Sequence, residues 1–278
     1  MSLMLKLLSI LILSTSILNA DALEESALKF EKNRLAQNPQ ITIKSVDIAI
    51  KKPVGNDGWY GIVFDIVADL QGKTVKAKDT VFTNGSMATP DLFNIKNGQS
   101  YKDTLKPTLT QNYYSDEHLI AGNKDAKHKI VIFSDPLCPF CIEYVSEVIR
   151  DVKKNPSLYA LYYYHFPLLS LHPDANVITK AMHVANSMGM KDVTLRTYEG
   201  AFHNYLKEHK NSDDKVLEAF NKVMNSNITL AQINKADVLE HIAKDVFLGE
   251  EVMVQGTPTV FFDGQYDKSR YKYDRVKK

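Results

Sequence analysis

The chain has 278 residues, with 34 Lys and Arg against 33 Asp and Glu, and two cysteines. This near-neutral balance gives no support to nucleic-acid binding or to electrostatic attachment to a membrane surface. The length is sufficient for two domains of ordinary size, even after removal of a short targeting segment.

The first twenty residues have the features of a secretory signal sequence. Lys6 supplies a positive charge, an apolar run interrupted only by Ser and Thr extends from Leu7 to Leu18, and Ala20 is a small residue of the kind that signal peptidase requires. The run is shorter than the roughly 20 residues that span a bilayer, which favours cleavage over a membrane anchor. We therefore expect residues 1–20 to be removed and the chain to be exported to oxidising surroundings, where a cysteine pair can persist as a disulfide.

Residues 21–110 are predicted to form a small domain with one helix and an antiparallel sheet. The helix is expected over 22–37, with an apolar stripe formed by Leu23, Ala27, Phe30 and Leu35. The apolar residues then alternate with period two, and a one-residue slip near Lys44-Ser45 predicts a β-bulge. This region has no cysteine and no dense cluster of reactive side chains, so its expected role is structural or interactive.

Residues 111–127 are mixed polar and charged, which is typical of a connector. A second domain is expected over 128–278, opening with a continuous apolar strand at 129–133 of the kind that is buried on both faces. A helical stretch is expected over about 173–247. Further strands are expected over 158–166, 257–263 and 266–273. Together these elements predict an α/β layered domain.

The two cysteines are separated by two residues, in the motif Cys138-Pro139-Phe140-Cys141. Residues i and i+3 share a helix face with Cα atoms roughly 5 Å apart, which is within the range that a disulfide can bridge. Pro139 suits the first helical position, so Cys138 is expected at the helix N-terminus, where unpaired N–H groups favour an anion. We therefore predict that Cys138 is the nucleophile and that Cys141, one turn deeper, is the resolving thiol.

Other roles for the cysteine pair are less well supported. A structural disulfide across so short a loop would contribute only about 2 kcal/mol. A zinc site would need two more ligands, and the eight histidines, His165 and His172 among them, are scattered along the chain. No metal and no organic cofactor is therefore expected, because the Cys138-Cys141 pair itself carries the electrons.

A second informative segment is Gly256-Thr257-Pro258-Thr259, at the start of an apolar strand. Proline is unusual there because it has no N–H to donate to a neighbouring strand.

The order of these features resembles the thioredoxin fold. The cysteine-free first domain and its connector resemble the periplasmic disulfide isomerases of the DsbC/DsbG family, and the segment from Asp135 to Cys141 is most similar to the DsbG branch. The resemblance implies that Cys138 attacks a substrate, that Cys141 resolves the product, and that Thr257-Pro258 is the cis-proline loop holding the substrate backbone.

The same resemblance implies a periplasmic homodimer, V-shaped and built by the first domain, with both catalytic domains facing a peptide-binding cleft. Its partners would be unfolded or misoxidised exported proteins. Because an isomerase must be kept reduced, a membrane electron donor of the DsbD type is also implied.

The chain departs from the family pattern at several positions. Ile132 stands six residues before the first cysteine, where thioredoxin relatives often have a buried acid, and Asp135 is a poor substitute. Phe140 replaces the histidine of DsbA-type oxidases, which removes one source of thiolate stabilisation. Either His165 or His172 could border the active site, although a packed or capping role is expected for both.

We predict an exported thiol-disulfide oxidoreductase that isomerises or reduces incorrect disulfides. Two alternatives stay open. The first is a DsbA-like net oxidase recharged by a DsbB-type membrane partner, because the direction of electron flow depends on the reduction potential. The second is a dimeric periplasmic chaperone or copper-binding protein that uses the cleft and the thiols for capture.

Overall fold

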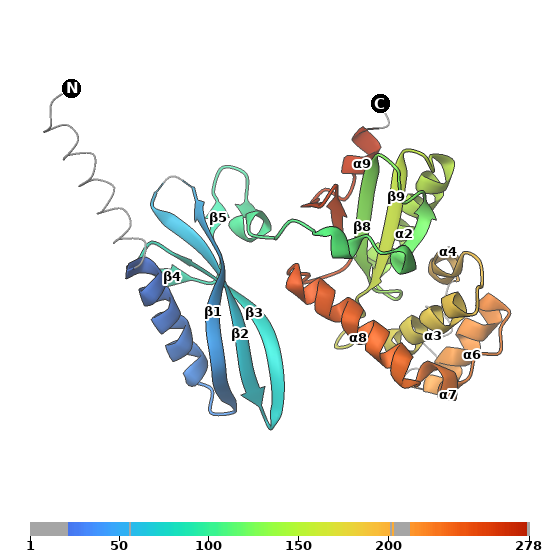
Figure 1. Cartoon of the computed structure of the whole chain (residues 1–278), viewed down its shortest axis with the longest axis horizontal. Helices are drawn as coiled ribbons and strands as arrows, with labels where there is room; N and C mark the ends of the chain where they lie inside the picture. The colour runs from blue at the N-terminus through green and yellow to red at the C-terminus, as the bar shows by residue number, and fades with distance from the viewer. Residues whose placement is uncertain (1–21, 56, 201, 203–211, 277–278) are drawn as a thin grey trace, which may run out of the picture. The chain divides into compact units, whose positions relative to one another are not determined.

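The computed structural model describes residues 22–276 except 56, 201 and 203–211. The chain divides between Lys106 and Pro107 into two compact units, which are described separately (Figure 1). The predicted signal sequence, residues 1–20, lies outside the described residues. No helix in the described part of the chain is long and apolar enough to cross a membrane.

The first unit consists of a helix over residues 22–36 packed on an antiparallel sheet of strand order β1-β2-β3-β4. The elements after the helix are β1 (Ile41–Val54), β2 (Trp59–Leu70), β3 (Lys73–Thr83), β4 (Ala88–Thr89), β5 (Phe93–Asn94), β6 (Gln99–Ser100) and the 3-10 helix η1 (Tyr101–Thr104). The pairing of β1 with β2 shifts register between Ile43 and Ser45, which confirms the predicted bulge.

The inner face of the first helix differs from the predicted stripe at one position. Ala27 is buried against the sheet, but Phe30 is 42% exposed, so its assignment to the stripe is wrong. The buried position one turn after Ala27 is taken instead by Glu31, as helical i, i+4 spacing requires. Arg34 donates to the Glu31 carboxylate from Nε at 2.9 Å, which compensates the buried charge.

The second unit is a five-stranded sheet of order β11-β10-β8-β9-β7 with helices on its faces. Only β8 and β9 are parallel. The strands are β7 (Leu119–Gly122), β8 (His128–Ser134), β9 (Tyr159–His165), β10 (Thr259–Phe262) and β11 (Gln265–Tyr266). The helices are α2 (Pro139–Lys154), α3 (Ala175–Ser187), α4 (Val193–Glu199), α6 (Asp213–Met224), α7 (Leu230–Ile233), α8 (Ala236–Glu251) and α9 (Lys272–Arg275).

The central strand β8 is buried on both faces, as its unbroken apolar sequence predicts. Ile130 and Ile132 pack into a core that includes the inner side of α2, whereas Val131 and Phe133 pack into a second core that includes residues after α8. This double burial holds the end of β8, and therefore the start of α2, in a fixed position.

The prediction of a connector over 111–127 is wrong for part of this segment. Leu119–Gly122 forms β7, an edge strand antiparallel to β9, and it is preceded by the 3-10 helices η2 (Gln111–Tyr113) and η3 (Asp116–His118). The strand has only four residues, of which only Ala121 is buried, so it is too short for a period-two pattern to indicate it in the sequence.

The strand predicted over 266–273 is also wrong beyond Tyr266. The buried carboxylate of Asp267 accepts hydrogen bonds from the backbone N–H groups of Ser269 and Lys272, which turns the chain away from the sheet. The chain then forms the single-turn helix α9.

Gly122 provides a test of β7. Its φ is +82°, and a Cβ atom there would lie 1.9 Å from the carbonyl oxygen of Tyr159. Gly189 has φ +75° with nothing within 4 Å, so it is a matched control for backbone strain alone. In urea denaturation, we expect Gly122→Ala to lower the free energy of unfolding by about 1–3 kcal/mol more than Gly189→Ala. Equal losses would contradict the close packing of β7 on β9.

Candidate active site

Cys138 lies at the junction of β8 and α2. It is the N-cap residue of α2, with φ −69° and ψ 122°, and Pro139 occupies the first helical position. The carbonyl oxygen of Cys138 accepts from the N–H groups of Cys141 at 2.9 Å and Ile142 at 3.1 Å, which starts the helix. Phe140 projects outward and is 71% exposed. The motif therefore begins a helix, as the sequence predicts.

The two cysteines have unequal surroundings. Both are free thiols; Cys138 is 5% exposed, and Cys141 is fully buried on the inner side of α2. The pKa of Cys138 is lowered to about 5, chiefly by a hydrogen bond from the Cys141 thiol and further by Thr257 and the backbone N–H groups of Cys141 and Phe140. Burial raises the pKa of Cys141. Cys138 is therefore the thiolate and Cys141 the proton donor at neutral pH.

The Thr257-Pro258 loop lies beside this pair. Antiparallel pairing of β10 with β8 sets Thr259 opposite Phe133, so the residues before Thr259 approach the end of β8. The Sγ atom of Cys138 lies 3.3 Å from the carbonyl oxygen of Thr257, to which the thiol donates when protonated. The Thr257-Pro258 peptide bond is cis. The structure thus brings together the predicted residues Cys138, Cys141, Thr257 and Pro258. Cys138 and Thr257, which are in contact, are 119 positions apart in the sequence.

Asp135 anchors the turn between β8 and α2. Its fully buried carboxylate accepts from the N–H of Leu137 at 2.7 Å, from the N–H of Leu168 at 2.8 Å and from Nδ1 of His172 at 2.9 Å. The N–H of Cys138 donates to the Asp135 carbonyl at 3.2 Å. Asp135 and His172 therefore hold the cysteine turn against the segment that follows β9. The sequence indicates that His172 could border the active site, but it does not predict the contact with Asp135.

A chain of hydroxyl groups lies behind Cys141. Tyr198 donates to Ser134 Oγ at 2.7 Å, and the hydroxyl groups of Tyr163 and Tyr198 are 2.8 Å apart. A hydrogen bond from Ser134 to Cys141 opposes part of the pKa increase that burial causes. Burial raises the pKa of both tyrosines well above the ordinary value, so they stay neutral donors. Ser134 directly precedes the motif, but nothing in the sequence indicates Tyr198 as its partner.

The fold and this paired-cysteine site define a thioredoxin-type protein. Residues 115–278, more than half of the chain, match the sequence model of the thioredoxin family, and the chain belongs to that family. No curated protein matches the chain.

Several solved structures resemble part of the chain at low identity. A proposed protein-disulfide isomerase from Pseudomonas syringae is 12% identical, with a TM-score of 0.48 over 56% of this chain and 91% of that one. A thioredoxin-like oxidoreductase from Silicibacter pomeroyi is 21% identical, with a TM-score of 0.44 over 61% and 98%. A periplasmic thioredoxin-like protein from Salmonella enterica serovar Typhimurium is 20% identical, with a TM-score of 0.43 over 59% and 89%.

The asymmetry of the pair predicts a distinctive pH profile. With a pKa of about 5, Cys138 is about 99% thiolate at pH 7, whereas an ordinary thiol of pKa about 8.5 is about 3% thiolate. Alkylation of the reduced protein by iodoacetamide should therefore rise with pH through an inflection near 5 and stay nearly constant from pH 6 to 8. Replacement of Cys138 by Ser should abolish this fast phase. An inflection near 8.5 would contradict the assignment.

Proposed function

We propose that this protein is an exported disulfide isomerase and reductase that corrects wrong disulfides in other exported proteins. The observation that carries the proposal is the coupled pair in which Cys141, buried and protonated, donates to the Cys138 sulfur beside Thr257. Membership of the thioredoxin family supports thiol-disulfide exchange as the reaction type. The resemblance of the cysteine motif to the DsbG branch supports isomerisation as its direction.

The proposed reaction begins with attack of the Cys138 thiolate on a substrate disulfide. The Cys138–substrate bond forms as the substrate S–S bond breaks, and one substrate sulfur leaves as a thiolate. When that thiolate attacks another substrate disulfide and a substrate thiolate then displaces Cys138, the disulfides are rearranged with no net electron transfer. When Cys141 attacks instead, the substrate is reduced by two electrons and the enzyme ends as the Cys138–Cys141 disulfide.

The hydrogen-bonded surroundings support distinct roles for the two sulfurs. Cys138 has the lower pKa of the two, so it is a good leaving group when a substrate thiolate displaces it from the mixed disulfide. Attack by Cys141 on the Cys138 sulfur expels the substrate thiolate instead and forms the Cys138–Cys141 disulfide. Cys141 must first lose its proton, and its burial keeps this step slow. A slow second step gives the substrate thiol time to act first, which favours isomerisation over reduction.

The location and the partners form part of the same proposal. The predicted signal sequence places the protein in the periplasm, and the cysteine-free first unit serves as a homodimerisation domain. The reductase branch consumes two electrons per turnover, so a membrane electron donor of the DsbD type would restore the reduced pair.

One observation favours a second candidate, a net oxidase. The low pKa of Cys138 stabilises the reduced protein relative to its disulfide, which makes the disulfide form a stronger oxidant. A DsbB-type membrane partner would then regenerate the disulfide. A chaperone or copper-binding protein remains the alternative from another class.

Refolding of a scrambled multi-disulfide protein in glutathione buffer separates these functions. The mature protein should restore native activity of the substrate without net loss of free thiols, and Cys138→Ser should reduce the rate to that of buffer alone. Activity only on fully reduced substrate would show an oxidase and contradict the proposal. Full protection of the substrate from aggregation by Cys138→Ser, without repair by either protein, would show a binding protein instead.

A further inference from the structure

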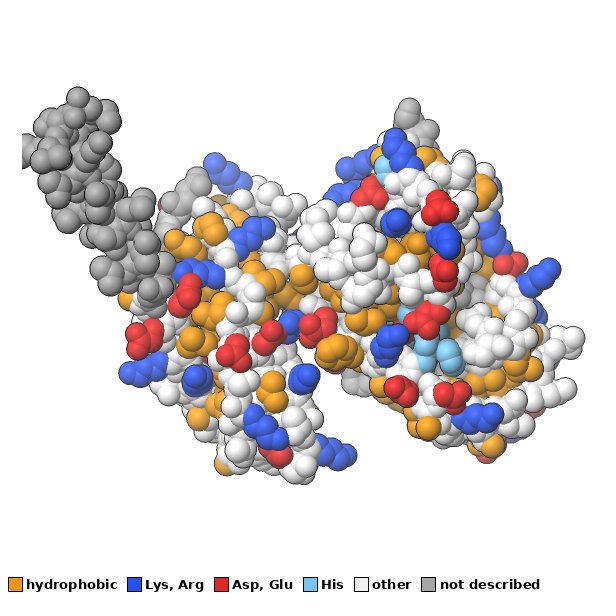
Figure 2. All heavy atoms as spheres, in the orientation of Figure 1, with side chains coloured by type: hydrophobic (Ala, Val, Ile, Leu, Met, Phe, Trp, Pro, Cys, Tyr) orange, Lys and Arg blue, Asp and Glu red, His pale blue; other side chains and the backbone are white. Residues whose placement is uncertain are grey.

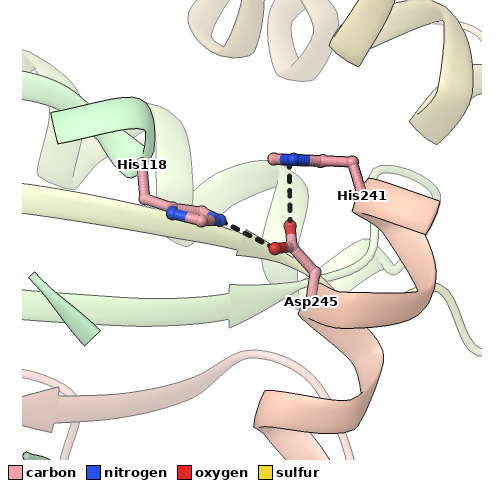
Figure 3. Close-up of side chains that lie close together, drawn as sticks. All are labelled: His118, His241 and Asp245. Atoms are coloured by element: carbon pink, nitrogen blue, oxygen red, sulfur yellow. Dashed lines mark hydrogen bonds and ion pairs between the residues drawn. The ribbon is translucent and has the colours of Figure 1, made fainter. Parts of the chain in front are cut away.

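A second cluster of chemically capable side chains lies in the thioredoxin unit and uses none of the redox-site residues. His118 ends η3, and His241 and Asp245 lie one turn apart on α8. One ligand atom from each residue lies within 4.8 Å of the other two. Each of the two imidazole rings lies next to a different oxygen of the Asp245 carboxylate (Figure 3). Among the described residues this is the one such group of three.

The ligand atoms of this cluster are held in place by other contacts. Ser115 Oγ lies 2.6 Å from Nδ1 of His118, so Nε2 points to Oδ1 of Asp245 at 2.7 Å. The other carboxylate oxygen, Oδ2, accepts from the N–H of His165 at 3.0 Å and lies 3.7 Å from Nε2 of His241. An outer hydrogen bond that fixes the ring of a histidine is a regular feature of metal ligation.

The cluster is also accessible from solvent. Asp245 is fully buried and His118 is 3% exposed, but the side chain of His241 is 16% exposed. The ring of His183 stacks on that of His241 with centroids 4.0 Å apart. Histidine side chains reach the surface together on one face of the second unit (Figure 2). An ion could therefore enter from the His241 side without opening the core.

We propose that His118 Nε2, His241 Nε2 and the Asp245 carboxylate bind a Zn²⁺ ion, with water in the fourth position. Imidazole nitrogen combined with one carboxylate suits zinc, whereas calcium and magnesium take oxygen ligands. Tetrahedral zinc with bonds of about 2.0–2.1 Å sets its ligand atoms roughly 3.3 Å apart. Asp245 Oδ1 lies 2.7 Å from His118 Nε2, and Oδ2 lies 3.7 Å from His241 Nε2. Because one ligand atom from each residue lies within 4.8 Å of the other two, side-chain rotation can bring the three atoms to the zinc spacing.

Such an ion would connect three parts of the thioredoxin unit. His118 immediately precedes β7, and the Asp245 carboxylate accepts a hydrogen bond from the N–H of His165 at the end of β9. Helix α8, which carries His241 and Asp245, leads into the segment that contains Thr257. The site was not visible in the sequence because His118 and His241 are far apart along the chain and only the fold unites them. Zinc binding should raise the unfolding temperature because the ion binds the folded state.

The test is calorimetric titration of Zn²⁺ into the untagged mature protein carrying Cys138→Ser and Cys141→Ser, so that thiols cannot bind the metal. We expect one Zn²⁺ per chain and an increase in unfolding temperature with added zinc. Adding His241→Gln should weaken binding at least about tenfold and remove the thermal shift, while the zinc-free unfolding temperature stays close to that of the parent. Because His241 is partly exposed, this variant should fold even where Asp245→Asn does not.

His128→Gln is the matched control. His128 Nδ1 lies 2.8 Å from Asp263 Oδ2, so this histidine–aspartate pair has the same chemistry. It does not belong to a group of three possible metal ligands among the described residues. Its substitution should leave zinc affinity unchanged. Absence of zinc binding by the parent, or equal affinity in the parent and His241→Gln, would overturn the proposal. Equal weakening by His128→Gln and His241→Gln would also overturn it, because surface histidines would then account for the binding.

Discussion

The pairing of β10 with β8 governs the chemistry of this protein. It joins two segments that are more than a hundred residues apart, and it brings the Thr257 carbonyl to 3.3 Å from the Cys138 sulfur. Without this register, Cys138 would lie at a helix N-terminus with no contact to the Thr257-Pro258 loop. With it, Cys138 is enclosed by the helix N-terminus on one side and by the cis-proline loop on the other.

The unequal burial of the two sulfurs follows from the same arrangement. Double burial of β8 fixes the point at which α2 begins, and the three hydrogen bonds of the Asp135 carboxylate hold the turn between them. Cys141 then faces the core while Cys138 stays at the helix end. The difference in pKa is thus a consequence of packing, and it supports the proposed roles of Cys138 in attack and of Cys141 in resolution.

Local patterns in the sequence were sufficient to predict several of these features. The Cys-Pro-Phe-Cys spacing, the unbroken apolar run of β8 and the alternation slip at Ser45 each depend on neighbours within a few residues. The edge strand β7 was missed because its pairing with β9 determines it. The last strand was predicted too long because the hydrogen bonds of Asp267 turn the chain after β11. The contacts of Tyr198 with Ser134 and of His172 with Asp135 join distant segments, so a single sequence carries no signal for them.

The central claim is that Cys138 attacks and Cys141 resolves. Mass spectrometry of the reduced protein mixed with a disulfide-bonded peptide tests this claim most directly. The account predicts that Cys141→Ser accumulates a stable mixed disulfide through Cys138, that Cys138→Ser forms none at the same pH, and that the unaltered protein releases reduced peptide. Accumulation of a mixed disulfide through Cys141 in the Cys138→Ser protein, at a rate similar to that of Cys141→Ser, would contradict it.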